Sequence, residues 1–264
     1  MKVEINGVGL NYRVEGPEGA PWLVFSNSLA TDLGMWDAEA AHYAGRYRIL
    51  RYDTRGHGGS AASPAPYDLD LLVADAEKLI EHVGATRPVF VGLSLGGMTA
   101  LGLALRRPAL LRAIAVCAAR ADAPDGFGAL WDERIGIARS KGMGALVEAT
   151  ISRWFTADLL AAKPAFLPGV VRMIETTPVE GYAGCAASLK GLDYFRQLER
   201  IRLPALFVAG ANDAAAPSAH MKAMSEKVAG SRFVELSPAG HLLNLQQPEA
   251  FRAALDGFLS SLGD

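Results

Sequence analysis

Residues 89–106 read VFVGLSLGGMTALGLALR, and this stretch decides the fold. Its first five residues form a short apolar run of the kind that becomes a buried strand, and the residues from Gly96 onward have a helical pattern. Between the two lies the pattern Gly-x-Ser-x-Gly, with Ser94 in the middle. A strand that turns this sharply into a helix lifts the serine clear of the sheet, and glycine on both sides relieves the crowding. The pattern therefore predicts that Ser94 is a nucleophile.

Similar apolar runs recur on both sides of this stretch. Their near-continuous hydrophobicity indicates strands of a parallel sheet covered on both faces, at residues 22–26, 47–52, 113–117 and 206–209. Helical patterns lie between several of these runs or after them, at residues 69–83, 96–106, 218–228 and 248–262. Alternating strands and helices predict an α/β fold with a mostly parallel central sheet and right-handed crossovers. Residues 1–16 alternate apolar with polar residues and predict a pair of strands.

The stretch from Pro124 to Arg196 breaks this rhythm. It is rich in helical patterns and aromatic residues and contains no convincing strand. It is too long for an ordinary loop, and insertions of this length usually carry a functional lid. We therefore expect a core formed by residues 1–123 and 197–264, with an inserted helical cap at 124–196.

A serine hydroxyl needs a base that removes its proton and an acid that orients the base. In this topology the chain order is serine, then the acid, then histidine. Asp213 follows the apolar run at 206–209 on a loop, and His241 lies on a glycine-containing loop before the last helix. The sequence therefore predicts the triad Ser94, Asp213 and His241, with Asp122 as the rival acid.

The negative oxygen of a tetrahedral intermediate also needs hydrogen-bond donors. One donor is expected to be the backbone amide of Leu95, directly after the nucleophile. The second should come from the loop at residues 27–30 after the first buried strand, and we select the amide of Leu29.

The remaining histidines are assigned no catalytic role. His57 stands among glycines, where a loop-packing role is favoured, while His42, His82 and His220 are expected at the solvated surface. The histidines are scattered without metal-ligand spacing, and the glycine-rich GVGLNYRVEG at residues 7–16 opens no helix. We therefore expect neither a metal nor a dinucleotide, and no other cofactor.

Composition narrows the class of partner. The 264 residues are 50% hydrophobic and 20% charged, which is enough apolar surface for a sizeable core. The net charge of −2 gives no positive field for nucleic acid or an anionic membrane, so a small-molecule partner is expected. Residues 1–16 lack the layout of a signal peptide, which favours a cytoplasmic protein, and Cys117 and Cys185 are expected to be buried free thiols. The oligomeric state is left open.

Together these motifs resemble those of the α/β-hydrolases over nearly the whole chain, and within them the 3-oxoadipate enol-lactonases of aromatic catabolism. The resemblance lies in SNSLATDLGMWD, YDTRGHGGS, GLSLGGMTA, LWDERI, RWF, GANDAAAP and GHLLNLQQPEAF. Most α/β-hydrolases have His-Gly where this chain has Asn27-Ser28, and Asn-Ser-Leu is typical of the enol-lactonase group. The stretch CAARADAP at residues 117–124 departs from the more polar sequence of that group.

The resemblance implies hydrolysis of 3-oxoadipate enol-lactone to 3-oxoadipate through an acyl-enzyme on Ser94. That substrate carries a free carboxylate, which needs a cation inside an otherwise apolar pocket. Arg134 and Arg153 on the cap are the candidates, with Trp131 and Trp154 as pocket walls. A broader carboxylesterase or perhydrolase with the same triad remains an alternative, as does a ligand-sensing protein of the same fold.

Overall fold

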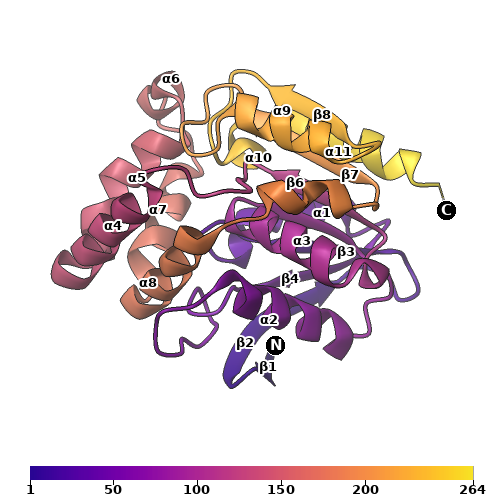
Figure 1. Cartoon of the computed structure of the whole chain (residues 1–264), viewed down its shortest axis with the longest axis horizontal. Helices are drawn as coiled ribbons and strands as arrows, with labels where there is room; N and C mark the ends of the chain where they lie inside the picture. Colours follow the sequence, from indigo (N-terminus) through magenta and orange to yellow (C-terminus); the bar gives the residue numbers. More distant parts are fainter. Residues whose placement is uncertain (264) are drawn as a thin grey trace.

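The computed structural model describes residues 1–263 and has an eight-stranded sheet at its centre (Figure 1). The spatial order of the strands is β1-β2-β4-β3-β5-β6-β7-β8. Their bounds are β1 Lys2–Ile5, β2 Val8–Glu15, β3 Trp22–Ser26, β4 Arg48–Tyr52, β5 Val89–Leu93, β6 Ala113–Cys117, β7 Ala205–Gly210 and β8 Arg232–Leu236. The apolar runs identified in the sequence are all strands of this sheet, so the predicted α/β fold is confirmed.

The sheet is antiparallel at one edge and parallel elsewhere. β1 and β2 form a hairpin, and β2 pairs antiparallel with β4; the five pairings from β4 to β8 are parallel. The hairpin turns at Asn6 and Gly7, whose φ angles of 48° and 77° are those that Asn-Gly supplies at low cost. In a parallel sheet the functional loops gather at the carboxyl ends of the strands, which is where Ser94 and Asp213 follow β5 and β7.

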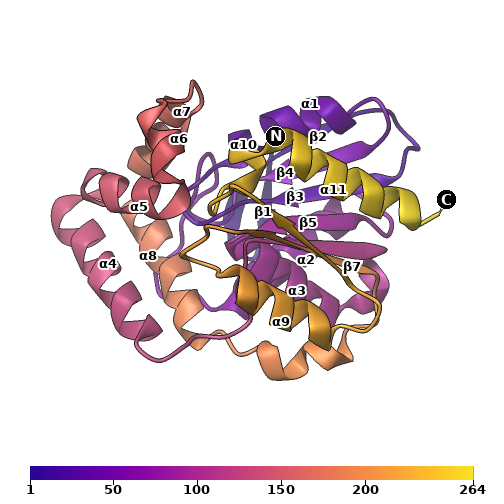
Figure 2. The same cartoon turned by 90° about the horizontal axis from the view of Figure 1, so that it is seen from above.

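Helices cover both faces of the sheet. Figure 2 shows α1 (Asp37–Tyr43) and α11 (Pro248–Ser261) on one side, with α3 (Leu95–Arg106) and α9 (Ser218–Lys227) on the other. Helix α2 (Leu69–His82) packs beside α3. Helices α2, α3, α9 and α11 agree with the predicted ranges within one residue at each end, whereas α1 was not predicted. Among the described residues, no helix is both long and apolar enough to cross a membrane.

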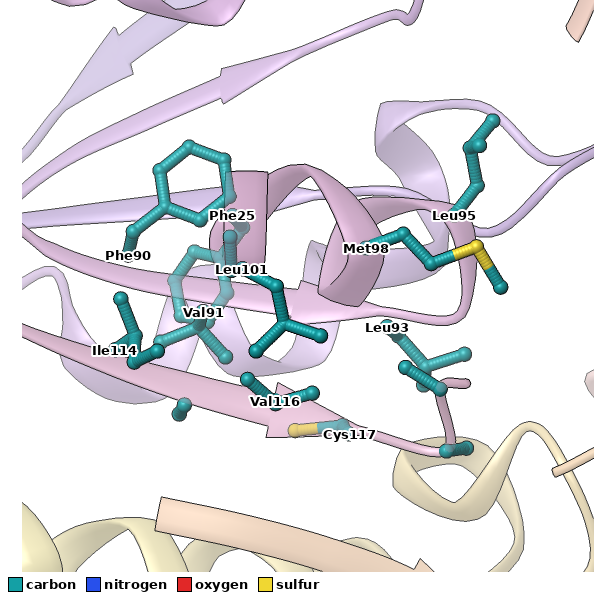
Figure 3. Packing of buried hydrophobic residues seen from close by; sticks show 14 of the residues in the cluster. Phe25, Phe90, Val91, Leu93, Leu95, Met98, Leu101, Ile114, Val116 and Cys117 are labelled. Atoms are coloured by element: carbon teal, nitrogen blue, oxygen red, sulfur yellow. The ribbon is translucent and has the colours of Figure 1, made fainter. Parts of the chain in front are cut away.

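The core between sheet and helices is densely apolar around the serine turn. Val91 of β5, Val116 of β6 and Leu101 of α3 are fully buried and meet in one cluster (Figure 3). All five residues of β5 are buried, as are all five of β6, which is the pattern expected for strands covered on both faces. Cys117 lies in this cluster, and Cys117 and Cys185 are both buried free thiols, as predicted.

The chain between β6 and β7 forms a separate helical layer, seen at the left of Figure 1. Its helices are α4 Phe127–Lys141, α5 Val147–Trp154, α6 Ala157–Ala161, α7 Leu167–Thr176 and α8 Val179–Ser188. Within the described chain this segment contains no strand, and a single isolated bridge joins Asp122 to Asp193 near its two ends. We propose that this layer is the cap, with the boundaries 124 and 196 given above.

Candidate active site

Ser94 occupies a strained turn between β5 and α3. Its φ of 57° and ψ of −112° lie outside the usual regions for an L residue, so surrounding contacts must hold it there. A Cβ on Gly92 would lie 2.0 Å from the carbonyl oxygen of Gly96, and a Cβ on Gly96 would lie 2.2 Å from that of Ser26. Glycine is therefore required at both positions. Leu93 and Leu95 lie on either side of the turn (Figure 3).

His241 and Asp213, the predicted base and its orienting acid, are joined by a hydrogen bond. Their Nδ1 and Oδ2 atoms are 2.8 Å apart, and both side chains are buried. The other carboxylate oxygen of Asp213 accepts hydrogen bonds from the amides of Ala215 and Ala216 at 2.7 and 3.0 Å. Because Nδ1 donates to the carboxylate, Nε2 keeps its lone pair and can accept a proton.

Ser94 and His241 line the same cavity. Within residues 1–263 no hydrogen bond joins the two side chains. The cavity is partly open to solvent, and apolar and aromatic side chains line most of it, with a few polar groups among them, as is usual in sites for small molecules.

Among the described residues, the two amides predicted to bind the oxyanion have no hydrogen-bond acceptor, whereas the amides on either side of Leu95 do. The amide of Ser94 donates to the carbonyl of Cys117, and that of Gly96 donates to the carbonyl of Asn27. No acceptor within the described residues receives the amide of Leu95 or that of Leu29. Leu29 lines the cavity together with Ser94, whereas Leu95 is not among the lining residues. Two amides without an acceptor next to the nucleophile are what an oxyanion hole would need, so we keep Leu29 and Leu95 as the proposed donors.

The loop that carries His241 is hydrogen-bonded to the helical layer. The amide of His241 donates to the carbonyl of Trp154 at 2.7 Å, and the two rings are stacked with centroids 6.2 Å apart. Gln246 links the loop to the same segment, because its Oε1 accepts from the amide of Gly240 and its Nε2 donates to Thr156 Oγ1. Movement of this segment would therefore move His241.

The structure brings all four predicted cap residues, Trp131, Arg134, Arg153 and Trp154, to the cavity wall. Arg134 is already held: its guanidinium donates to Tyr182 Oη at 3.2 Å and to Thr150 Oγ1 at 2.6 Å. The side chain of Arg153 makes no ion pair or hydrogen bond with any of residues 1–263. Burial lowers the pKa of Arg153, and the nearby Arg134 adds to that shift.

Sequence reasoning missed a third arginine. Arg120 lines the cavity from the segment after β6, where it pairs with Asp122 at 3.2 Å and lies over the ring of Phe127. Its position directly after a strand could have suggested this. No aspartate or glutamate is among the lining residues. The wall therefore combines three cations with aromatic and aliphatic side chains.

The rival acid does not reach His241. Asp122 instead lies between Arg120 and His220, whose Nε2 is 3.4 Å from its Oδ1. His220 is half-buried against Phe195, so the expectation of a solvated surface residue is wrong for it, whereas His42 and His82 are exposed. Within the described chain no group of three or more histidine, cysteine, aspartate or glutamate side chains could hold a metal ion.

A family model, curated sequences and a solved structure that match this chain are all of hydrolases. The model of the family described as "Alpha/beta hydrolase family" matches residues 19–254. The 3-oxoadipate enol-lactonases 2 and 1 of Acinetobacter baylyi are each 33% identical to the chain, over 96% and 97% of its length and 93% and 95% of theirs. The crystal structure of an enol-lactonase from Burkholderia xenovorans LB400 superposes with a TM-score of 0.95 at 37% identity, covering 98% of this chain and 100% of that one.

Proposed function

The chain belongs to the alpha/beta hydrolase family and is a carboxylic ester hydrolase, and we propose that it opens the ester bond of 3-oxoadipate enol-lactone to give 3-oxoadipate. Two independent features support the substrate. The relatives named above carry this activity in their names, and the cavity that holds Ser94 is lined by three arginines and no carboxylate. Such a wall suits a small anionic ester.

The first half of the reaction forms an acyl-enzyme. His241 Nε2 takes the proton of Ser94 as its Oγ attacks the lactone carbonyl, and Asp213 stabilises the imidazolium that results. The amides of Leu29 and Leu95 receive the oxyanion of the tetrahedral intermediate. The intermediate collapses by breaking the ring C–O bond, whose electron pair leaves on the enolate oxygen.

The second half releases the product. The enolate remains tethered to the acyl chain, so protonation by the imidazolium of His241 and tautomerisation to the ketone remove the nucleophile that could close the ring again. Water then attacks the acyl-enzyme with His241 as base, and the carboxylate of 3-oxoadipate departs as Ser94 recovers its proton.

Arg153 is the observation that carries the substrate assignment. It is a half-buried cation on the wall of the cavity that also holds Ser94 and His241, and its side chain has no partner within residues 1–263. Partial desolvation of an unpaired guanidinium is costly, and the carboxylate of the substrate would compensate it with charge-assisted hydrogen bonds. Arg134, already bonded to Tyr182 and Thr150, would then shape the wall and support the same charge at longer range.

Replacing Arg153 tests this directly. We expect Arg153→Ala to raise KM for the enol-lactone about 10- to 100-fold, the value of one charge-assisted contact, and to leave KM for a neutral ester of similar size unchanged. The control is Arg139→Ala, which removes an exposed arginine paired with Glu180 on the helical layer. Equal effects of Arg153→Ala on both substrates would exclude a carboxylate role.

The nucleophile is tested by Ser94→Ala, with the enol-lactone and p-nitrophenyl acetate assayed side by side. We expect losses of about 10⁴-fold or more on both substrates. A wild-type preference for the neutral aryl ester would instead indicate a broader carboxylesterase or perhydrolase, and binding of the lactone with negligible turnover would indicate a ligand sensor. Full activity in Ser94→Ala would contradict the mechanism.

A further inference from the structure

We propose that His57 is a positioning residue that fixes the oxyanion amide of Leu29 by accepting a hydrogen bond from the neighbouring amide of Ala30. The inference rests on the function proposed above, because it assigns His57 to the same reaction. His57 itself does not line the cavity and forms no hydrogen bond with Asp213 or His241. Its effect on the reaction must therefore pass through the loop.

The hydrogen bonds of His57 define its protonation. The ring is fully buried, and its Nδ1 lies 3.1 Å from the carbonyl oxygen of Arg55, which can only accept. Nδ1 therefore carries the proton, and Nε2 is left to accept from the amide of Ala30 at 3.0 Å. Burial lowers the pKa of His57 to about 4, so the ring stays neutral, and a good acceptor, near neutral pH.

The Ala30 bond matters because Ala30 is held in an unfavourable conformation. Its φ is 61°, in the left-handed region that residues other than glycine rarely adopt. Such a conformation persists only when contacts around it enforce it. The backbone amide of Ala30 donates its hydrogen bond to His57, so His57 is one of the contacts that hold Ala30 in this conformation.

Leu29 stands between two peptide groups that are both held. The group before it is fixed at its carbonyl end, because the oxygen of Ser28 accepts from the amide and the hydroxyl of Thr31 at 3.3 and 2.8 Å. In a trans peptide the N–H points opposite to the C=O, so this contact turns the Leu29 amide away from Thr31. The group after Leu29 is fixed at its amide end by His57. Without the second restraint, rotation about Leu29 would misdirect the donor.

Two variants separate the acceptor from the rest of the ring. In His57→Gln the side-chain carbonyl oxygen can reach the position of Nε2 and accept from Ala30. In His57→Asn the shorter side chain can still donate to Arg55 but does not reach Ala30. Both changes remove the ring and leave a cavity, so their effects on folding should be similar. Cys185→Ala is the control, because it removes the thiol that lies 4.0 Å from Nδ1 without altering the Ala30 bond.

The readouts are kcat and KM, the affinity for phenylboronic acid, which forms a tetrahedral adduct on a nucleophilic serine, and hydrogen exchange at the Ala30 amide. For His57→Asn we expect kcat and boronate affinity to fall about 10- to 100-fold, KM to stay within about twofold, and exchange at Ala30 to accelerate. For His57→Gln and Cys185→Ala we expect kcat within about fivefold of wild type, with Ala30 still protected.

Equal losses of kcat in the Gln and Asn variants, in step with their thermal stabilities, would show that His57 only packs the loop and would overturn the proposal. Unchanged protection of Ala30 in His57→Asn would overturn it as well. Failure of the proposed function looks different, because Ser94→Ala would then keep its activity while exchange at Ala30 still distinguished the two His57 variants.

Discussion

A buried neutral histidine makes the stability of this protein depend on pH. The pKa of His57 is about 4 in the folded chain, because burial lowers it from 6.5, while the hydrogen bond to the carbonyl of Arg55 and the charge of Asp32 act in the opposite direction. The unfolded chain therefore binds more protons between these two values. By linkage, the contribution of His57 to stability is fully present above pH 6.5 and is lost as the pH falls toward 4.

The size of this effect is measurable. The difference between 6.5 and about 4 corresponds to about 3 kcal/mol of unfolding free energy over the whole window. Urea denaturation of the wild type and of His57→Gln, followed from pH 7 to pH 4, should show a shallower loss for the variant, which has no proton to gain at this position. Parallel curves for the two proteins would mean that His57 does not titrate as its burial implies.

At the scale of elements, the contact between the loop that carries His241 and α5 is possible only because residue 240 is a glycine. A Cβ on Gly240 would lie 2.3 Å from the carbonyl oxygen of Trp154, the same oxygen that accepts the amide of His241. No side chain fits there unless the loop and the end of α5 separate. That separation would move His241 relative to Ser94, and misplacement of a catalytic group by about 1 Å can cost about 100-fold in rate.

We therefore expect Gly240→Ala to lower kcat about 100-fold or more, while its melting temperature falls by only a few degrees. Gly257→Ala on α11 is the matched control, because a Cβ there meets nothing within 4 Å and alanine favours the helix. Steady-state kinetics and thermal unfolding of both variants would test this. If Gly240→Ala keeps the wild-type kcat, the loop does not need its contact with α5.

Elements with a local signal could be predicted from the sequence. β5 and β6 are continuous apolar runs, and the turn at Ser94 has glycine where any side chain would clash. The helical layer gave weaker signals because burial within it is uneven: in α4 only Phe127 and Ala138 are buried, whereas most residues of α8 are buried. Contacts between segments far apart in the chain left no signal in the local sequence. The cavity role of Arg120 and the half-buried position of His220 depend on neighbours that no local pattern reveals.

At the scale of the whole molecule, the proposed active site forms only because the chain leaves the sheet after β6 and returns to it at β7. Ser94 and Asp213 follow β5 and β7, which flank β6, and the helical layer is inserted between β6 and β7. Asp213 is thereby brought into a sheet begun by residues far earlier in the chain. The two parts of the core, before and after the insertion, therefore cannot fold as independent halves that each carry the site.

The net charge of the whole molecule and the arginines of the cavity affect an anionic substrate at different stages of binding. The net charge of −2 provides no long-range field that would draw in an anionic substrate, whereas the arginines of the cavity act on a substrate that has already entered it. Exposed charges farther apart than about 10 Å are screened at 0.1 M salt, while partly buried pairs are screened much less. An anion recognised only inside the cavity should therefore bind with little dependence on ionic strength.

Measuring kcat/KM between about 20 mM and about 300 mM salt tests this, because the Debye length shortens several-fold over that range. We expect the value for the enol-lactone to change by less than about threefold and to follow that for a neutral ester, while Arg153→Ala keeps its raised KM for the lactone at both salt concentrations. A tenfold fall confined to the anionic substrate would place its capture at the surface. Recognition would then begin outside the cavity, and the arginines around Ser94 would act on a substrate already concentrated there.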